Sequence, residues 1–117
     1  MISSSQNPET IYFHGGAPEI GVGKMILPPN ETKAFTFSPR TDRVYVVTDF
    51  LHAVLYAAMH PSKRGAVYRV KPIGVLVSDP DCKIQGLSFS CERAIVVEKM
   101  IISPAIMIAA KAAIATS

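Results

Sequence analysis

Four side chains that could bind or activate a ligand are scattered along this 117-residue chain: His14, Tyr45, Tyr56 and Asp79. The two nitrogens of an imidazole can donate and accept hydrogen bonds, a tyrosine combines an apolar ring with a polar tip, and a carboxylate accepts hydrogen bonds. Each of these residue types, taken singly, is more often structural than functional. A function that uses them therefore requires a fold that brings the four together.

The surrounding patterns predict the elements that would position these residues. Alternating or β-branched runs predict strands at 10–14, 33–37, 42–47, 66–70, 73–77, 87–89 and 93–100. Apolar residues at three- and four-residue spacing predict a helix over 49–60, capped by Thr48 or Asp49. Ser103 and Pro104 predict the start of a short C-terminal helix, which we expect to pack on the core. Many strands with two helices favour an α+β domain.

Composition and charge limit the class of protein. The chain is 49% hydrophobic and 18% charged, which is typical of an ordered globular protein. We expect a loosely ordered lead over residues 1–9 and a single domain over 10–117. The net charge of +3 forms no dense basic stripe, so nucleic-acid binding is not supported. Without a secretory signal or a bilayer-spanning segment, we expect a cytoplasmic protein with reduced thiols and no membrane contact.

Several common site motifs are excluded by the sequence. The Gly-rich "HGGAPEIGVGK" does not lead from a strand into a helix, as a dinucleotide-binding turn would. It is not a phosphate-binding loop either, because its Gly23 and Lys24 are followed by Met25 rather than Ser or Thr. The histidines are far apart and the cysteines form no CxxC pair, so no metal site is predicted. No motif indicates a serine or cysteine nucleophile.

Four stretches occur in an order that is found in a known family. They are "YFHGG" at 12–16, "RVYVVTDFLHAVLYAA" at 43–58, "KRGAVYRVKPIGVLVSDPD" at 63–81 and "LSFSCERAIVVE" at 87–98. Their His-Gly step, Val-Tyr strand, Ala-rich helix, Val-x-Pro-x-Gly step and Asp-Pro pair resemble the rifamycin-inactivating ADP-ribosyltransferases. These enzymes are small members of the diphtheria-toxin-like superfamily, which is defined by an ordered His, Tyr and acidic triad. The resemblance covers roughly residues 11–98.

The resemblance implies a mostly antiparallel two-sheet core with two short helices. It also implies cleavage of the nicotinamide–ribose bond of NAD, the co-substrate, with transfer of ADP-ribose to an acceptor. The catalytic residues would be His14, which binds the ribose on the adenosine side, Tyr45, and Asp79, which stabilises positive charge developing on the other ribose. Gly15 would bind the nicotinamide amide through backbone that its missing Cβ leaves accessible, and Tyr45 and Tyr56 would stack on the ring.

The acceptor is less closely defined by the resemblance. A rifamycin-like small molecule is the first expectation, and a protein or nucleic acid, as for toxins and phage host modifiers, is the second. An RNA 2′-phosphotransferase-like enzyme and a degenerate, non-catalytic nucleotide-binding domain are further alternatives. Tyr56 lies eleven positions after Tyr45, a spacing typical of the toxin and poly-ADP-ribose polymerase branches, whereas the rifamycin enzymes have a small residue there. Asp81 is the alternative to Asp79 as the functional carboxylate.

Overall fold

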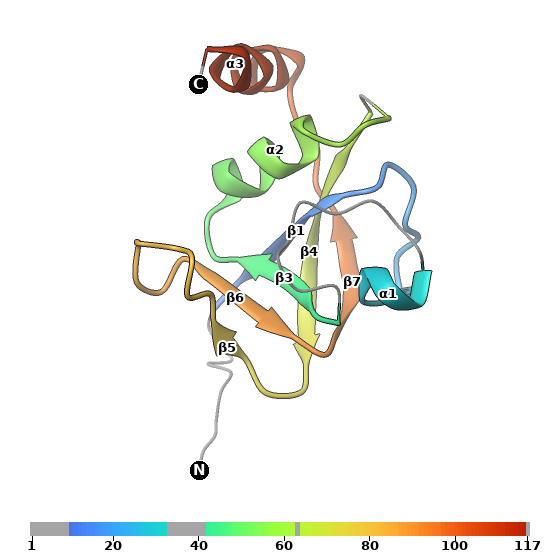
Figure 1. Ribbon diagram of the computed structural model, residues 1–117. Coiled ribbons are helices and arrows are strands. Elements are labelled where there is room, and N and C mark those ends of the chain that lie inside the picture. Colours follow the sequence, from blue (N-terminus) through green and yellow to red (C-terminus); the bar gives the residue numbers. More distant parts are fainter. Residues whose placement is uncertain (1–9, 33–41, 63, 117) are drawn as a thin grey trace.

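A computed structural model describes residues 10–32, 42–62 and 64–116 of the chain. The helices of this part are α1 (Pro29–Thr32), α2 (Phe50–Ala58) and α3 (Pro104–Ala115). Its strands are β1 (Tyr12–Gly16), β2 (Met25–Ile26), β3 (Val44–Val47), β4 (Ala66–Ile73), β5 (Val77–Ser78), β6 (Ser88–Cys91) and β7 (Arg93–Lys99). Figure 1 shows α2 above the sheet and α3 above α2, at the top of the molecule.

The described strands form one seven-stranded sheet in the order β2-β7-β4-β1-β3-β6-β5, and each neighbouring pair is antiparallel. β4 pairs with β1 over five aligned positions and with β7 over six. β1 and β3, by contrast, share the single aligned pair Phe13 and Val47. The sheet therefore consists of two groups of strands, β2-β7-β4-β1 and β3-β6-β5, that are joined at one point.

Both faces of the sheet carry buried apolar side chains. Successive residues of a strand point to opposite faces, and β4 shows this alternation directly. Ala66, Tyr68 and Val70 belong to one buried cluster, whereas Val67 belongs to a second cluster that includes Ala53 and other residues of α2. The core thus lies on both sides of β4, and α2 covers one of them.

The two longer helices begin at Asp49, one of the two capping residues that the sequence offers for α2, and at the predicted Ser103. The Asp49 carboxylate accepts a hydrogen bond from the backbone N–H of His52 at 3.0 Å, and α2 follows it. The Ser103 hydroxyl accepts one from the backbone N–H of Ile106 at 3.2 Å, and Pro104 takes the first helical position of α3. These side chains satisfy backbone donors that the first turn of a helix leaves without a partner.

Two glycines let α2 lie directly on the sheet. A Cβ atom added to Gly15 in β1 would collide with the carbonyl oxygen of Ala53. A Cβ atom added to Gly65, which precedes β4, would collide with the carbonyl oxygen of Ala57. Glycine at both positions therefore sets the distance between the helix and the strands.

The α+β class that the sequence predicts is confirmed, but the described strands form one sheet instead of the two we expected. The reason is the pair Phe13 and Val47, which keeps the two groups of strands connected. The described part also has three helices rather than two, because α1 forms at Pro29–Thr32, where the sequence patterns predict no element. The C-terminal helix is twelve residues long and buries only Ala110.

Other differences concern the strand bounds. We expected separate strands at 66–70 and 73–77, but β4 runs through Pro72 to Ile73, and β5 begins at Val77. Proline is tolerated there because the ladder between β4 and β1 ends at Val70, so that Pro72 lies beyond it. The predicted strand at 33–37 and the predicted lead at 1–9 lie outside the described residues. A single domain over 10–117 stays a prediction.

Candidate functional site

A cavity of about 970 Å³ opens where β1 and β3 diverge. The antiparallel register that pairs Phe13 with Val47 would place His14 opposite Val46 and Gly15 opposite Tyr45, but the ladder of these strands contains neither pair. β1, β3, α2 and residues 79–88, which begin just after β5 and end in β6, all contribute to the lining. The lining includes the five site residues that the sequence predicts: His14, Gly15, Tyr45, Tyr56 and Asp79.

His14 bridges the gap between the diverging strands. Its Nδ1–H donates to the backbone carbonyl of Tyr45 at 2.9 Å, so the side chain replaces a backbone donor that β1 no longer supplies. This bond leaves Nε2 as the unprotonated nitrogen of the neutral ring. Burial lowers the pKa of His14, and the bond to the Tyr45 carbonyl opposes this only in part. The ring lies over Gly16, where an added Cβ would be 2.9 Å from Nε2.

Tyr56 and Asp79 line the cavity from different elements. Tyr56 is on α2, and Asp79 follows β5. Burial raises the pKa of the Tyr56 hydroxyl, and the nearby charges of Asp79 and Cys82 raise it further. Tyr56 is 41% exposed, so it forms part of the rim of the cavity.

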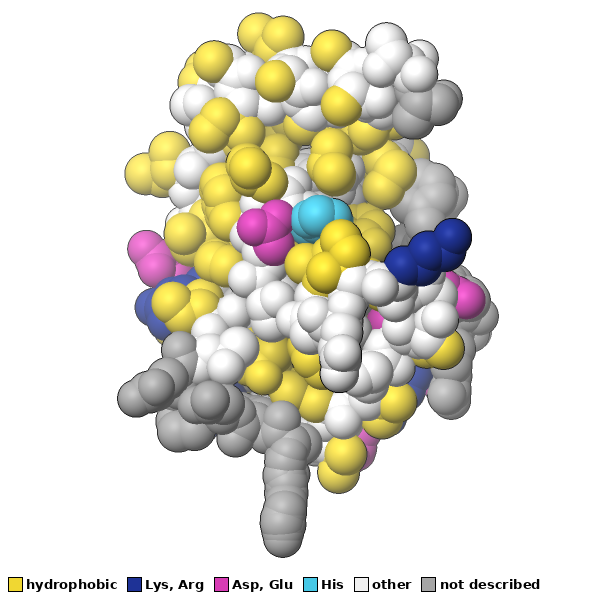
Figure 2. Space-filling view, turned by 90° about the vertical axis from the view of Figure 1, so that its left-hand side faces the viewer, with side chains coloured by type: hydrophobic (Ala, Val, Ile, Leu, Met, Phe, Trp, Pro, Cys, Tyr) yellow, Lys and Arg dark blue, Asp and Glu magenta, His cyan; other side chains and the backbone are white. Residues whose placement is uncertain are grey.

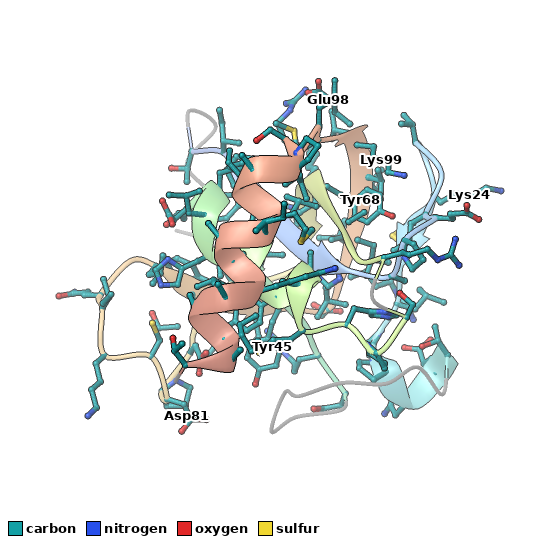
Figure 3. The ribbon with its side chains drawn as sticks, turned by 90° about the horizontal axis from the view of Figure 1, so that it is seen from above. Lys24, Tyr45, Tyr68, Asp81, Glu98 and Lys99 are labelled. Atoms are coloured by element: carbon teal, nitrogen blue, oxygen red, sulfur yellow. The ribbon has the colours of Figure 1, made fainter. Side chains whose placement is uncertain are left out.

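The carboxylate of Asp79 is held on both oxygens. Oδ2 accepts a hydrogen bond from the Ser88 hydroxyl at 3.0 Å, and Oδ1 accepts one from the backbone N–H of Asp81 at 2.9 Å. Asp79 is half-buried, whereas Asp81 is exposed, and Figure 3 shows Asp81 at the edge of the molecule, in the connection between β5 and β6. Of the two carboxylates, Asp79 is therefore the one with a fixed orientation inside the site.

Gly15 lines the cavity, but the structure explains the need for glycine at this position differently from what we expected. We expected the bare backbone to give a ligand access. Instead, the position that a Cβ would take is filled by the carbonyl of Ala53 in α2. Glycine is therefore required at this position for helix packing, whether or not its backbone also binds a ligand.

Sequence reasoning did not single out His52 and His60, yet both line the cavity together with His14. On α2 and just beyond it, His52, Tyr56 and His60 occur at four-residue intervals and therefore share one face of the helix. That spacing is the signal that could have identified them. Nδ1 of His52 donates to Asp49 Oδ2 at 2.9 Å. Nδ1 of His60 instead accepts a hydrogen bond from the backbone N–H of Ser62 at 3.1 Å.

Three further observations concern the described residues as a whole. Within them, no group of three or more His, Cys, Asp or Glu side chains is arranged to hold a metal ion. No helix among them is long and apolar enough to cross a membrane. Both cysteines are free thiols: Cys91 is buried, and burial raises its pKa to about 11, whereas Cys82 is partly exposed and lines the cavity.

Comparisons with known proteins do not identify a family for this chain. No protein-family model matches the chain, and no curated protein matches it.

Proposed function

We propose that this protein is an NAD-dependent mono-ADP-ribosyltransferase that cleaves the nicotinamide–ribose bond and transfers ADP-ribose to an acceptor. The observation that carries the proposal is the meeting of His14, Tyr45, Tyr56 and Asp79, from four separate places in the chain, at one cavity. The cavity volume of about 970 Å³ lies within the range of roughly 300–1,000 Å³ that is typical of small-molecule sites. The divergence of β1 and β3 is in keeping with the two-sheet core that the sequence resemblance implies.

The proposed roles agree with the chemistry of each group. Unprotonated Nε2 of His14 would accept a hydrogen bond from a ribose hydroxyl. The rings of Tyr45 and Tyr56 would stack on nicotinamide, each contributing roughly 1–3 kcal/mol if values for base–aromatic stacking apply. Asp79 would stabilise the positive charge that develops on the ribose, and Ser88 would keep its carboxylate in place. Because nicotinamide leaves as a neutral molecule from a cationic reactant, the enzyme would need no acid to assist it.

The experiment is to incubate the purified protein with NAD and to measure nicotinamide release and the NAD-induced shift in unfolding temperature. Asp79→Asn should lower the rate of release by roughly 10²–10³, as for loss of one preorganised electrostatic partner. Asp81→Asn is the matched control, because Asp81 lines the same cavity but is exposed, and it should retain the wild-type rate. Loss of activity in the Asp81 variant alone would show that the carboxylate has been misassigned.

The acceptor is tested in the same reaction. With rifampicin present, a product heavier by one ADP-ribose would identify a small hydroxylated acceptor. Slow release of nicotinamide with unmodified rifampicin would favour a protein or nucleic-acid acceptor.

A second candidate is a non-catalytic nucleotide-binding domain. It is favoured by the two internal hydrogen bonds of Asp79, which a carboxylate with a purely structural role in a turn would also make. This candidate predicts an increase in unfolding temperature with NAD or ADP-ribose but no nicotinamide release. If neither binding nor release occurs, both candidates are wrong.

A further inference from the structure

Asp49 and His52 form a carboxylate–imidazole pair at the edge of the cavity. Oδ2 of Asp49 is 2.9 Å from Nδ1 of His52, and the same oxygen accepts the backbone N–H of His52 at 3.0 Å. These two bonds lower the pKa of Asp49, so its carboxylate is charged. The charge fixes the proton of His52 on Nδ1 and leaves Nε2 free of a proton in the neutral ring.

The position of His52 places this pair beside the proposed site. His52 lies one helical turn before Tyr56 on the same face of α2, and both side chains line the cavity. Tyr56 in turn lies close enough to Asp79 for the two to interact electrostatically. The side chain of His52 is 41% exposed, so a proton on it can pass to water.

We propose that His52 is the general base that removes the proton of an acceptor hydroxyl, with Asp49 as the residue that positions it. This inference rests on the proposed ADP-ribosyl transfer and goes beyond it, because it assigns the acceptor to the class of hydroxyl compounds. Because nicotinamide leaves without the help of an acid, the remaining proton transfer of the reaction is the loss of the acceptor's proton, which a base on the acceptor side would receive.

Three other proton acceptors of the cavity are less suited to this role. Nε2 of His14 lies against Gly16 and is the proposed partner of a ribose hydroxyl of NAD. Both oxygens of Asp79 already accept hydrogen bonds. Nδ1 of His60 accepts the backbone N–H of Ser62, so that Nε2 carries the proton of its neutral ring and cannot accept another.

The step balances without a further reactant. The bond between the nicotinamide nitrogen and C1 of the ribose breaks, and its electron pair stays on nicotinamide. The acceptor oxygen forms a new bond to the same carbon. Its proton passes to Nε2 of His52 and from there to water, and the imidazolium that exists in between is stabilised by the Asp49 carboxylate.

The test compares an acceptor that must lose a proton with one that has none to lose. Methanol is the hydroxyl acceptor and azide is the anionic acceptor, and methyl-ADP-ribose and ADP-ribosyl azide are measured by mass spectrometry alongside nicotinamide release. The key variant is His52→Asn, whose amide can still donate to Asp49 but which has no group at the position of Nε2. The unfolding temperature of this variant should match that of the wild type.

General-base catalysis contributes typically 10²–10⁴ in rate. His52→Asn should therefore lower methyl-ADP-ribose formation by about 10² or more and leave formation of the azide adduct within about threefold of the wild type. Asp49→Asn, which keeps a good helix cap but loses the charge, should lower methanol transfer by a smaller factor. His60→Asn is the matched control on the same cavity wall and should leave both products unchanged.

Two outcomes would overturn the assignment while the proposed function stands. In one, His52→Asn lowers both products equally, which would mean that His52 acts on NAD and not on the acceptor. In the other, it lowers neither. If the wild-type protein releases no nicotinamide with either acceptor, the proposed function fails and this inference fails with it.

Discussion

His14 is held as a neutral imidazole by two features of its surroundings. Burial disfavours the charged form and lowers the pKa of the ring, and the Tyr45 carbonyl fixes the remaining proton on Nδ1. The ring therefore enters the cavity as a hydrogen-bond acceptor rather than as a cation. A hydroxyl group of a ligand is the natural partner for such a nitrogen.

This state of His14 predicts how stability depends on pH. The pKa of the folded protein lies below the ordinary value of 6.5, so the unfolded chain binds a proton that the folded chain excludes. Stability from this group is therefore complete above pH 6.5 and is lost as the pH falls below it, with a slope of at most about 1.4 kcal/mol per pH unit for one proton. His14→Asn keeps a donor for the Tyr45 carbonyl but does not titrate.

The measurement is urea unfolding of the wild type and of His14→Asn at several pH values on both sides of 6.5. The wild type should lose its stability advantage over the variant toward the acid side. His60→Asn serves as a control for loss of a partly exposed histidine. A difference that does not change with pH would contradict a buried neutral imidazole.

At the scale of elements, α2 connects helix packing to the cavity. Its inner side lies on Gly15 and Gly65 through the carbonyls of Ala53 and Ala57. Another side of it presents His52 and Tyr56 to the cavity. A shift of α2 away from the sheet would therefore move both lining side chains at once, so the two glycines support the site without contacting a ligand.

Gly15→Ala should lower the free energy of unfolding by about 1–3 kcal/mol, the usual cost of overpacking, because the new methyl group meets helix backbone that cannot move aside cheaply. Gly21→Ala is the matched control: its added Cβ would be 3.4 Å from the flexible Lys24 side chain, and it should change stability little. Urea unfolding of both variants and of the wild type measures these changes in the free energy of unfolding. Weakened NAD binding with unchanged stability in Gly15→Ala would contradict the packing explanation.

At the scale of the whole molecule, burial is unevenly distributed. β4 buries five of its eight residues, whereas α3 buries only Ala110. Figure 2 shows hydrophobic side chains along the length of α3 at the surface, and Ile106 and Ile108 are 37% and 69% exposed. α3 packs on α2 through Ala110, which joins the buried cluster of Ala53 and its neighbours. The helix is therefore the least anchored of the longer elements described.

Hydrogen exchange should show this difference directly. Backbone amides of α3 should exchange faster than those of β4, because opening α3 exposes little buried apolar surface whereas opening β4 disrupts both buried clusters. Ala110→Asp should accelerate exchange in α3 further, and Ala113→Asp, at an exposed position of the same helix, should not. Equal protection of α3 and β4 would mean that α3 is held by contacts beyond Ala110.

Much of the local structure follows from the sequence. The caps at Asp49 and Ser103 and the apolar spacing after Asp49 predict where α2 and α3 begin, because helix starts depend on residues close together in the chain. The order of the main strands also follows from local patterns. Within the candidate site, the resemblance selected five residues that line one cavity, but it gave no reason to consider His52 or His60.

What the sequence determined by itself is thus the order and type of most elements, since periodicity and capping are encoded over a few neighbouring residues. Only the tertiary structure decided that one sheet forms, that β1 and β3 separate after a single pair, and that His14 bridges the gap by binding the Tyr45 carbonyl. These features depend on contacts between residues about thirty positions apart, such as His14 and Tyr45. No local pattern reports such contacts, because strand register and cavity shape are fixed only when distant segments pack together.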